Sequence, residues 1–93
     1  MWEKLLELLK NNSVSEAMEV ITLMQPDQFE LAVEIHTGEM DIYDAQMTRK
    51  KFARYADTIG GSKRGPEKGA WFNVAYNLTP NSGRSSVARS YNR

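Results

Sequence analysis

Apolar residues recur at helical spacing through the first part of the chain. Trp2, Leu5, Leu6 and Leu9 follow the spacing i, i+3, i+4 and i+7, which places them on one face of an α-helix. The polar pair Asn11–Asn12 comes next and is expected to end this helix. A second helix is predicted to begin at Ser13, because Ser13 and Glu16 have the spacing of a capping box. Its apolar face consists of Ala17, Val20, Ile21 and Met24.

The same pattern predicts two further helices. Pro26 forbids continuation of the second helix and is favourable in the first turn of a third. The inner face of the third consists of Phe29, Ala32, Val33 and His36, with Leu31 and Ile35 beside them. Gly38 is expected to end it, and Asp41 to cap a fourth helix from about Ile42 to Ile59. The inner line of the fourth consists of Ala45, Phe52, Ala56 and Ile59. The predicted fold class is all-α, a small helical bundle of about four short helices over residues 1–59.

The pattern changes after Gly60–Gly61, which we interpret as a helix stop. Residues 62–70 contain Gly, Pro, Lys and Arg and no core residue, and they are predicted to be a linker. The segment WFNVAYNL (71–78) then alternates, with Phe72, Val74, Tyr76 and Leu78 on one face. We therefore expect an extended C-terminal arm with one strand-like segment. The predicted domains are a helical bundle (1–61), a linker (62–70) and an extended basic arm (71–93).

A lone strand leaves its backbone groups unpaired, so the arm is expected to bind a partner. The tail after it is rich in Ser, Asn and Arg, has no acidic residue, and cannot bury enough apolar surface to order itself. The predicted partner-binding residues are Trp71, Phe72, Val74, Tyr76, Leu78, Arg84, Arg89, Tyr91 and Arg93.

Charge divides the chain into two halves although its net charge is zero. Residues 1–46 carry ten acidic and two basic residues, for a net charge of −8, and residues 47–93 carry ten basic and two acidic residues, for +8. Such asymmetry favours head-to-tail self-association or two partners of opposite charge. A candidate anion or nucleic-acid patch consists of Arg49, Lys50, Lys51, Arg54, Lys63, Arg64 and Lys68. Solvated helix faces and a protein partner are the alternatives for these cations.

Residues suited to catalysis or metal binding are scarce. The chain has no Cys and a single His, His36, which is expected to pack or to interact with a helix end. There is no nucleophile-elbow motif, and the glycine-rich stretch 60–65 lacks the spacing of a phosphate-binding loop. We therefore predict no catalytic, metal or cofactor site and no enzymatic activity.

Three functional hypotheses remain. The first is a non-enzymatic structural or assembly subunit that forms homo- or hetero-oligomers, such as a phage or viral minor virion component; an acidic helical head with a basic extended arm is common among small phage-encoded accessory proteins, which is an analogy of layout. The first alternative is an inhibitor or adaptor whose acidic helices cover a basic cleft on a target. The second is a nucleic-acid-binding accessory protein that uses residues 49–68 and the Arg tail. The start of the chain lacks the apolar run of a signal peptide or a membrane span, so we expect a cytoplasmic or intravirion location.

Overall fold

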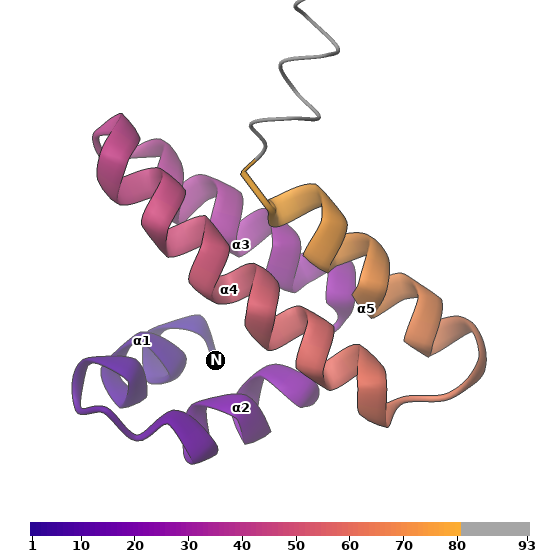
Figure 1. The fold of residues 1–93 in the computed structure, drawn as a ribbon. Helices are drawn as coiled ribbons and strands as arrows, with labels where there is room; N and C mark the ends of the chain where they lie inside the picture. Colours follow the sequence, from indigo (N-terminus) through magenta and orange to yellow (C-terminus); the bar gives the residue numbers. More distant parts are fainter. Residues whose placement is uncertain (81–93) are drawn as a thin grey trace, which may run out of the picture.

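The computed structural model describes residues 1–80, which form five α-helices and no strand. The helices are α1 (Trp2–Lys10), α2 (Val14–Thr22), α3 (Pro26–Gly38), α4 (Ile42–Ser62) and α5 (Gly65–Leu78). The long α4 runs through the molecule, α3 and α5 pack along it, and α1 and α2 lie together on one side (Figure 1). The prediction of a small all-α bundle is confirmed, with five helices in residues 1–80 where about four were expected. None of these helices is both long enough and apolar enough to cross a membrane.

The predicted starts of α3 and α4 are confirmed. Pro26 lies in the first turn of α3, where its missing N–H leaves no hydrogen bond unmade. The Asp41 side chain caps α4 by accepting a hydrogen bond of 2.9 Å from the Asp44 N–H. Asp41 therefore satisfies one of the backbone donors that every helix leaves free at its start.

The predicted capping box at Ser13 is wrong. Asn12 adopts a left-handed conformation (φ 62°), and the Ser13 N–H donates to the Leu8 carbonyl (2.8 Å). This arrangement is a Schellman turn that ends α1. Because Ser13 belongs to that turn, its backbone (φ −88°, ψ 67°) is not extended, and its side chain makes no capping hydrogen bond to α2.

The predicted linker and strand are also wrong, because residues 65–78 form α5. The segment 71–78 fits helical spacing as well as alternation, and helix formation buries Trp71, Val74, Ala75 and Leu78 at i, i+3, i+4 and i+7. Pro66 in the first turn, followed by Glu67, repeats the start signal of Pro26 and Asp27 in α3. The expected stop at Gly60–Gly61 comes slightly too early: α4 continues through both glycines and ends at Ser62.

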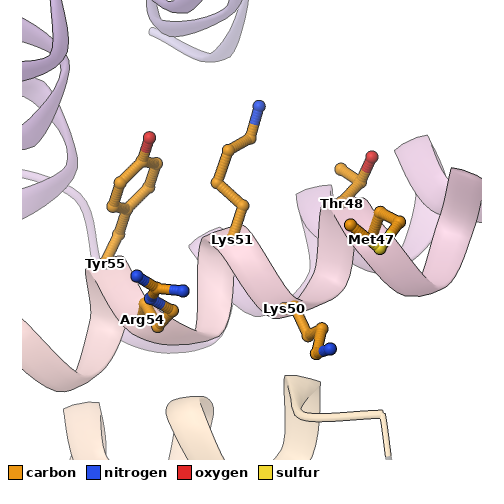
Figure 2. Close-up of a pocket in the computed structure, with 6 residues that line it drawn as sticks. All are labelled: Met47, Thr48, Lys50, Lys51, Arg54 and Tyr55. Carbon is orange, nitrogen blue, oxygen red and sulfur yellow. The ribbon is translucent and has the colours of Figure 1, made fainter.

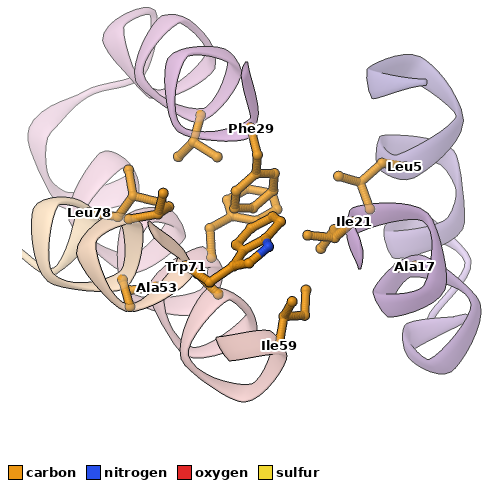
Figure 3. Packing of buried hydrophobic residues seen from close by; sticks show 13 residues of the cluster. Leu5, Ala17, Ile21, Phe29, Ala53, Ile59, Trp71 and Leu78 are labelled. Carbon is orange, nitrogen blue, oxygen red and sulfur yellow. The ribbon is translucent and has the colours of Figure 1, made fainter. Parts of the chain in front are cut away.

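The core is centred on three aromatic rings (Figure 3). The ring centroid of Phe29 on α3 lies 5.7 Å from that of Phe52 on α4 and 5.7 Å from that of Trp71 on α5. Leu5 and Ile21 bring α1 and α2 onto this cluster. The other buried apolar residues are Ala17, Val33, Ala53, Ala56, Ile59, Val74, Ala75 and Leu78. The predicted domain division implies that residues 1–61 fold without α5, and this stays a prediction for a truncated chain.

Candidate interaction surface

Three of the seven cations predicted to form an anion patch instead bind the C-terminal carbonyls of neighbouring helices. Arg49 binds the end of α5: its Nε donates to the Leu78 carbonyl (3.1 Å) and its Nη2 to the Asn77 carbonyl (2.8 Å). A guanidinium can hold two carbonyls at once because its donors form a rigid fork. Positive charge there also complements the negative end of the helix dipole.

Lys63 and Lys68 play the same part at two other helix ends. The Lys63 ammonium donates to the carbonyl of Thr22, the last residue of α2 (3.3 Å), and forms an ion pair with Glu67 (3.3 Å). The Lys68 ammonium donates to the Gly60 carbonyl near the end of α4 (3.0 Å) and lies 5.2 Å from the centroid of the Phe72 ring. These two lysines bind helix ends within the same chain. They therefore contribute less to an exposed basic surface than lysines without such contacts would.

The remaining cations of the predicted patch are exposed. Lys50, Lys51 and Arg54 lie on α4, and Arg64 precedes α5. Lys51 and Tyr55 project from one side of α4 and Lys50 from the other (Figure 2). The Lys51 ammonium lies 5.8 Å from the Phe52 ring centroid. The basic residues of α4 therefore divide between two faces.

Among the residues that the structure describes, the depression in Figure 2 is lined by α4 alone. These residues are Met47, Thr48, Lys50, Lys51, Arg54 and Tyr55. A single helix cannot enclose a ligand from two sides, which pockets for small molecules require. Partial burial raises the pKa of the Tyr55 hydroxyl above its ordinary value, although the nearby Arg54 charge opposes this shift. Tyr55 is therefore neutral at physiological pH.

A second depression, between α4 and α5, does have two walls. We name it the α4–α5 groove; its lining residues are Lys50, Ala53, Arg54, Asp57, Phe72, Ala75, Tyr76 and Thr79. The small side chains of Ala53 and Ala75 are almost fully buried and form its floor. Phe72 is 39% exposed and Tyr76 59% exposed. The α4 wall carries charges and the α5 wall carries aromatic rings.

The structure gives the predicted partner-binding residues different locations. Trp71, Val74 and Leu78 are buried in the core of the same chain and cannot reach a partner. Phe72 and Tyr76 remain exposed and lie in the groove. Arg84, Arg89, Tyr91 and Arg93 lie outside the described residues. The prediction missed Ala53, Asp57, Ala75 and Thr79 as groove residues, and a helical wheel of residues 65–78 would have separated the buried from the exposed aromatics.

The two oppositely charged halves of the chain do not pair with each other within residues 1–80. The ion pair found there, Lys63–Glu67, lies inside the basic half. The acidic residues of α1 and α2 are exposed, as are most of those on α3 and before α4. Glu30 on α3 is an exception, because it accepts a hydrogen bond from Asn77 Nδ2 of α5 (3.2 Å). Within residues 1–80 the acidic and basic halves therefore keep their charges separate.

Within residues 1–80, no group of three or more His, Asp and Glu side chains is placed to hold a metal ion. His36 packs its ring against Trp2, with centroids 5.6 Å apart, in the last turn of α3. Comparisons with protein-family models, with curated proteins and with solved structures find no match for this chain.

Proposed function

We propose that this chain is a non-enzymatic interaction subunit of a larger protein assembly, and that the α4–α5 groove holds an amphipathic, acidic helix of its partner. The observation that supports this function is the combination of a small-residue floor with exposed aromatic and basic walls. A phage or viral assembly role, suggested by the layout of the sequence, is one setting for such a subunit.

The shape of the groove favours a helix as the bound element. Two packed helices leave a furrow between them into which a third helix can lie, and recognition of this kind uses apolar anchors at i and i+4. Ala53 and Ala75 allow the backbone of the bound helix to approach closely. Phe72 and Tyr76 offer the exposed aromatic surface that is enriched at the energetic centres of interfaces.

The charges of the groove favour an acidic partner. Lys50 and Arg54 lie on its α4 wall, and the structure gives neither of them an ion pair within residues 1–80. Complementary charge accelerates association and selects orientation. The partner is therefore expected to present carboxylates next to its apolar anchors.

A single-stranded nucleic acid is the competing ligand, because Phe72 and Tyr76 resemble the stacking surfaces of such binding proteins. One feature counts against it. Arg49, Lys63 and Lys68 are already engaged with helix ends.

The test is co-purification with matched variants. Three tagged proteins are expressed in the cells that normally make the chain. They are the wild type, the groove variant Lys50→Glu/Arg54→Glu and the control variant Lys4→Glu/Arg64→Glu. Both variants change the net charge equally, and neither control residue lines the groove. Circular dichroism verifies that each stays helical.

The proposal requires a stoichiometric protein that the groove variant loses and the control retains. A second copy of the chain, with a different tag, counts as such a protein. Nucleic acid that is lost in the same pattern contradicts the proposal, and so does the absence of any groove-dependent partner.

A further inference from the structure

The outer face of α3 combines apolar and acidic side chains, as expected of a helix that binds the α4–α5 groove. Leu31 and Ile35 stand one helical turn apart and are 52% and 59% exposed. Asp27 and Glu34, which share that face with them by helical spacing, are also exposed. The face thus combines an aliphatic pair with flanking carboxylates, and no residue of chain positions 1–80 forms an ion pair with those carboxylates.

This face turns away from the core. The buried residues of α3 are Phe29, Val33 and Thr37, whereas Leu31 and Ile35 lie about two residues on and therefore roughly opposite them around the helix. Exposed aliphatic residues are ordinary when scattered, but a pair at i and i+4 is the arrangement that a helix uses to enter a groove.

We infer that the partner helix is α3 of a second copy: Leu31 and Ile35 of one molecule enter the α4–α5 groove of the next, with Asp27 and Glu34 near Lys50 and Arg54. This inference rests on the proposed function of the groove and names its occupant. The aliphatic pair would contact Phe72 and Tyr76 above the alanine floor.

The two surfaces lie on different sides of one molecule. Phe52 on α4 and Trp71 on α5 both contact Phe29 of α3, so the inner sides of α4 and α5 face α3. Lys50, Arg54, Phe72 and Tyr76 lie in the groove on the outer side. A molecule can therefore use its groove and its α3 face at the same time. Such a heterologous contact leads to rings or to open chains of subunits, according to the rotation between neighbours.

Complementary half-defective variants provide the test. The groove variant Lys50→Glu/Arg54→Glu keeps the α3 face, and the face variant Leu31→Gln/Ile35→Gln keeps the groove. The control variant Lys4→Glu/Arg64→Glu keeps both. All changed residues are exposed, and circular dichroism verifies the fold of each protein. Sedimentation velocity measures association of the full-length chains at about 10–100 µM, where a weak interface is populated.

We expect the wild type and the control to form species larger than a dimer. Each defective variant should be monomeric or should associate about tenfold more weakly or worse. Their 1:1 mixture should stop at a dimer, because one intact face meets one intact groove and the other two surfaces cannot propagate. An interface with twofold symmetry would not give this pattern, since its wild type would itself stop at a dimer, and that result overturns the inference.

A wild type that stays monomeric across this range overturns the inference, as does association that either variant leaves unchanged. The proposed function is tested separately, by co-purification. If the wild type is monomeric while co-purification still yields a different, groove-dependent protein, the groove is a docking site and α3 of a second copy is not its occupant.

Discussion

The ring of Phe72 on α5 covers Gly60 of α4 so closely that a Cβ at residue 60 would lie 2.8 Å from the ring carbons Cδ1 and Cε1. Gly61, the next residue, has nothing within 4 Å of the corresponding position. Neighbouring glycines thus have different roles: Gly60 allows α5 to approach α4, and Gly61 makes no such contact.

We therefore expect Gly60→Ala and Gly61→Ala to change the free energy of unfolding in opposite directions. In Gly61→Ala the helix gains about 0.5–1 kcal/mol from the better propensity of alanine. In Gly60→Ala the same gain is outweighed by overpacking that costs about 1–3 kcal/mol. Urea denaturation of both variants gives the comparison. Stabilisation by Gly60→Ala would contradict the close contact, and adding Phe72→Ala should remove most of its penalty.

Asp41 and Ser13 provide a second matched pair. Asp41 accepts a hydrogen bond from the Asp44 N–H, whereas the Ser13 side chain makes no capping bond. Asp41→Ala should therefore lower the free energy of unfolding by about 1 kcal/mol, and Ser13→Ala should change it by clearly less. Equal losses in thermal or urea denaturation would mean that Ser13 caps α2 after all.

The sequence predicted α1 to α4 well because each combines an apolar stripe at helical spacing with a helix start or stop signal beside it. Phe52, Ala56 and Ile59 lie on a single helical face and cannot be read as alternating, whereas residues 29–36 fit both periods and are identified as helical by Pro26 before them. A start signal such as Pro26 or Asp41 then fixed the boundary. Local residues decided these elements, so the structure agrees with the pattern.

The segment 71–78 failed because a short, mostly apolar run satisfies both periods. Phe72, Val74, Tyr76 and Leu78 alternate, while Trp71, Val74, Ala75 and Leu78 follow helical spacing. Contacts distant in sequence decided between them, since Trp71 packs against Phe29. The groove could not be predicted for the same reason: its α5 wall exists only once the segment is helical. The role of Arg49 depends on a partner carbonyl about 28 residues away.

Arg49 is expected to be a stability residue. Arg49→Lys keeps the charge but cannot hold the Leu78 and Asn77 carbonyls together. We expect a loss of about 1–2 kcal/mol in urea denaturation, with faster amide exchange in the last turn of α5. Lys50→Ala, one residue away on the exposed surface, is the control and should stay within about 0.5 kcal/mol of the wild type. An Arg49→Lys variant as stable as the control would contradict the capping role.

Trp71 carries a buried indole N–H with no hydrogen-bond partner in the described part of the chain. An unsatisfied buried donor costs about 1–3 kcal/mol, so its removal in Trp71→Phe should offset much of the lost packing. We expect Trp71→Phe to destabilise the fold less than Phe52→Leu, which removes ring volume and no polar group. The comparison uses urea denaturation. If Trp71→Phe proves the more costly of the two, the indole N–H has an acceptor in solution.

The last prediction concerns nucleic acid. With Arg49, Lys63 and Lys68 engaged at helix ends, the predicted patch keeps Lys50, Lys51, Arg54 and Arg64 to displace counterions from a phosphate backbone. We therefore expect the intact chain to bind single- and double-stranded DNA and RNA more weakly than about 1 µM at physiological salt, with a log–log salt slope no steeper than about 1 to 2. Filter binding over a salt series measures both quantities. A steeper slope with tight binding, abolished by Lys50→Glu/Arg54→Glu and retained by Lys4→Glu/Arg64→Glu, would place phosphates in the α4–α5 groove and exclude the acidic helix as its ligand. Tight binding that both variants retain would instead assign the phosphates to cations outside the groove, and the groove would remain a protein-docking site.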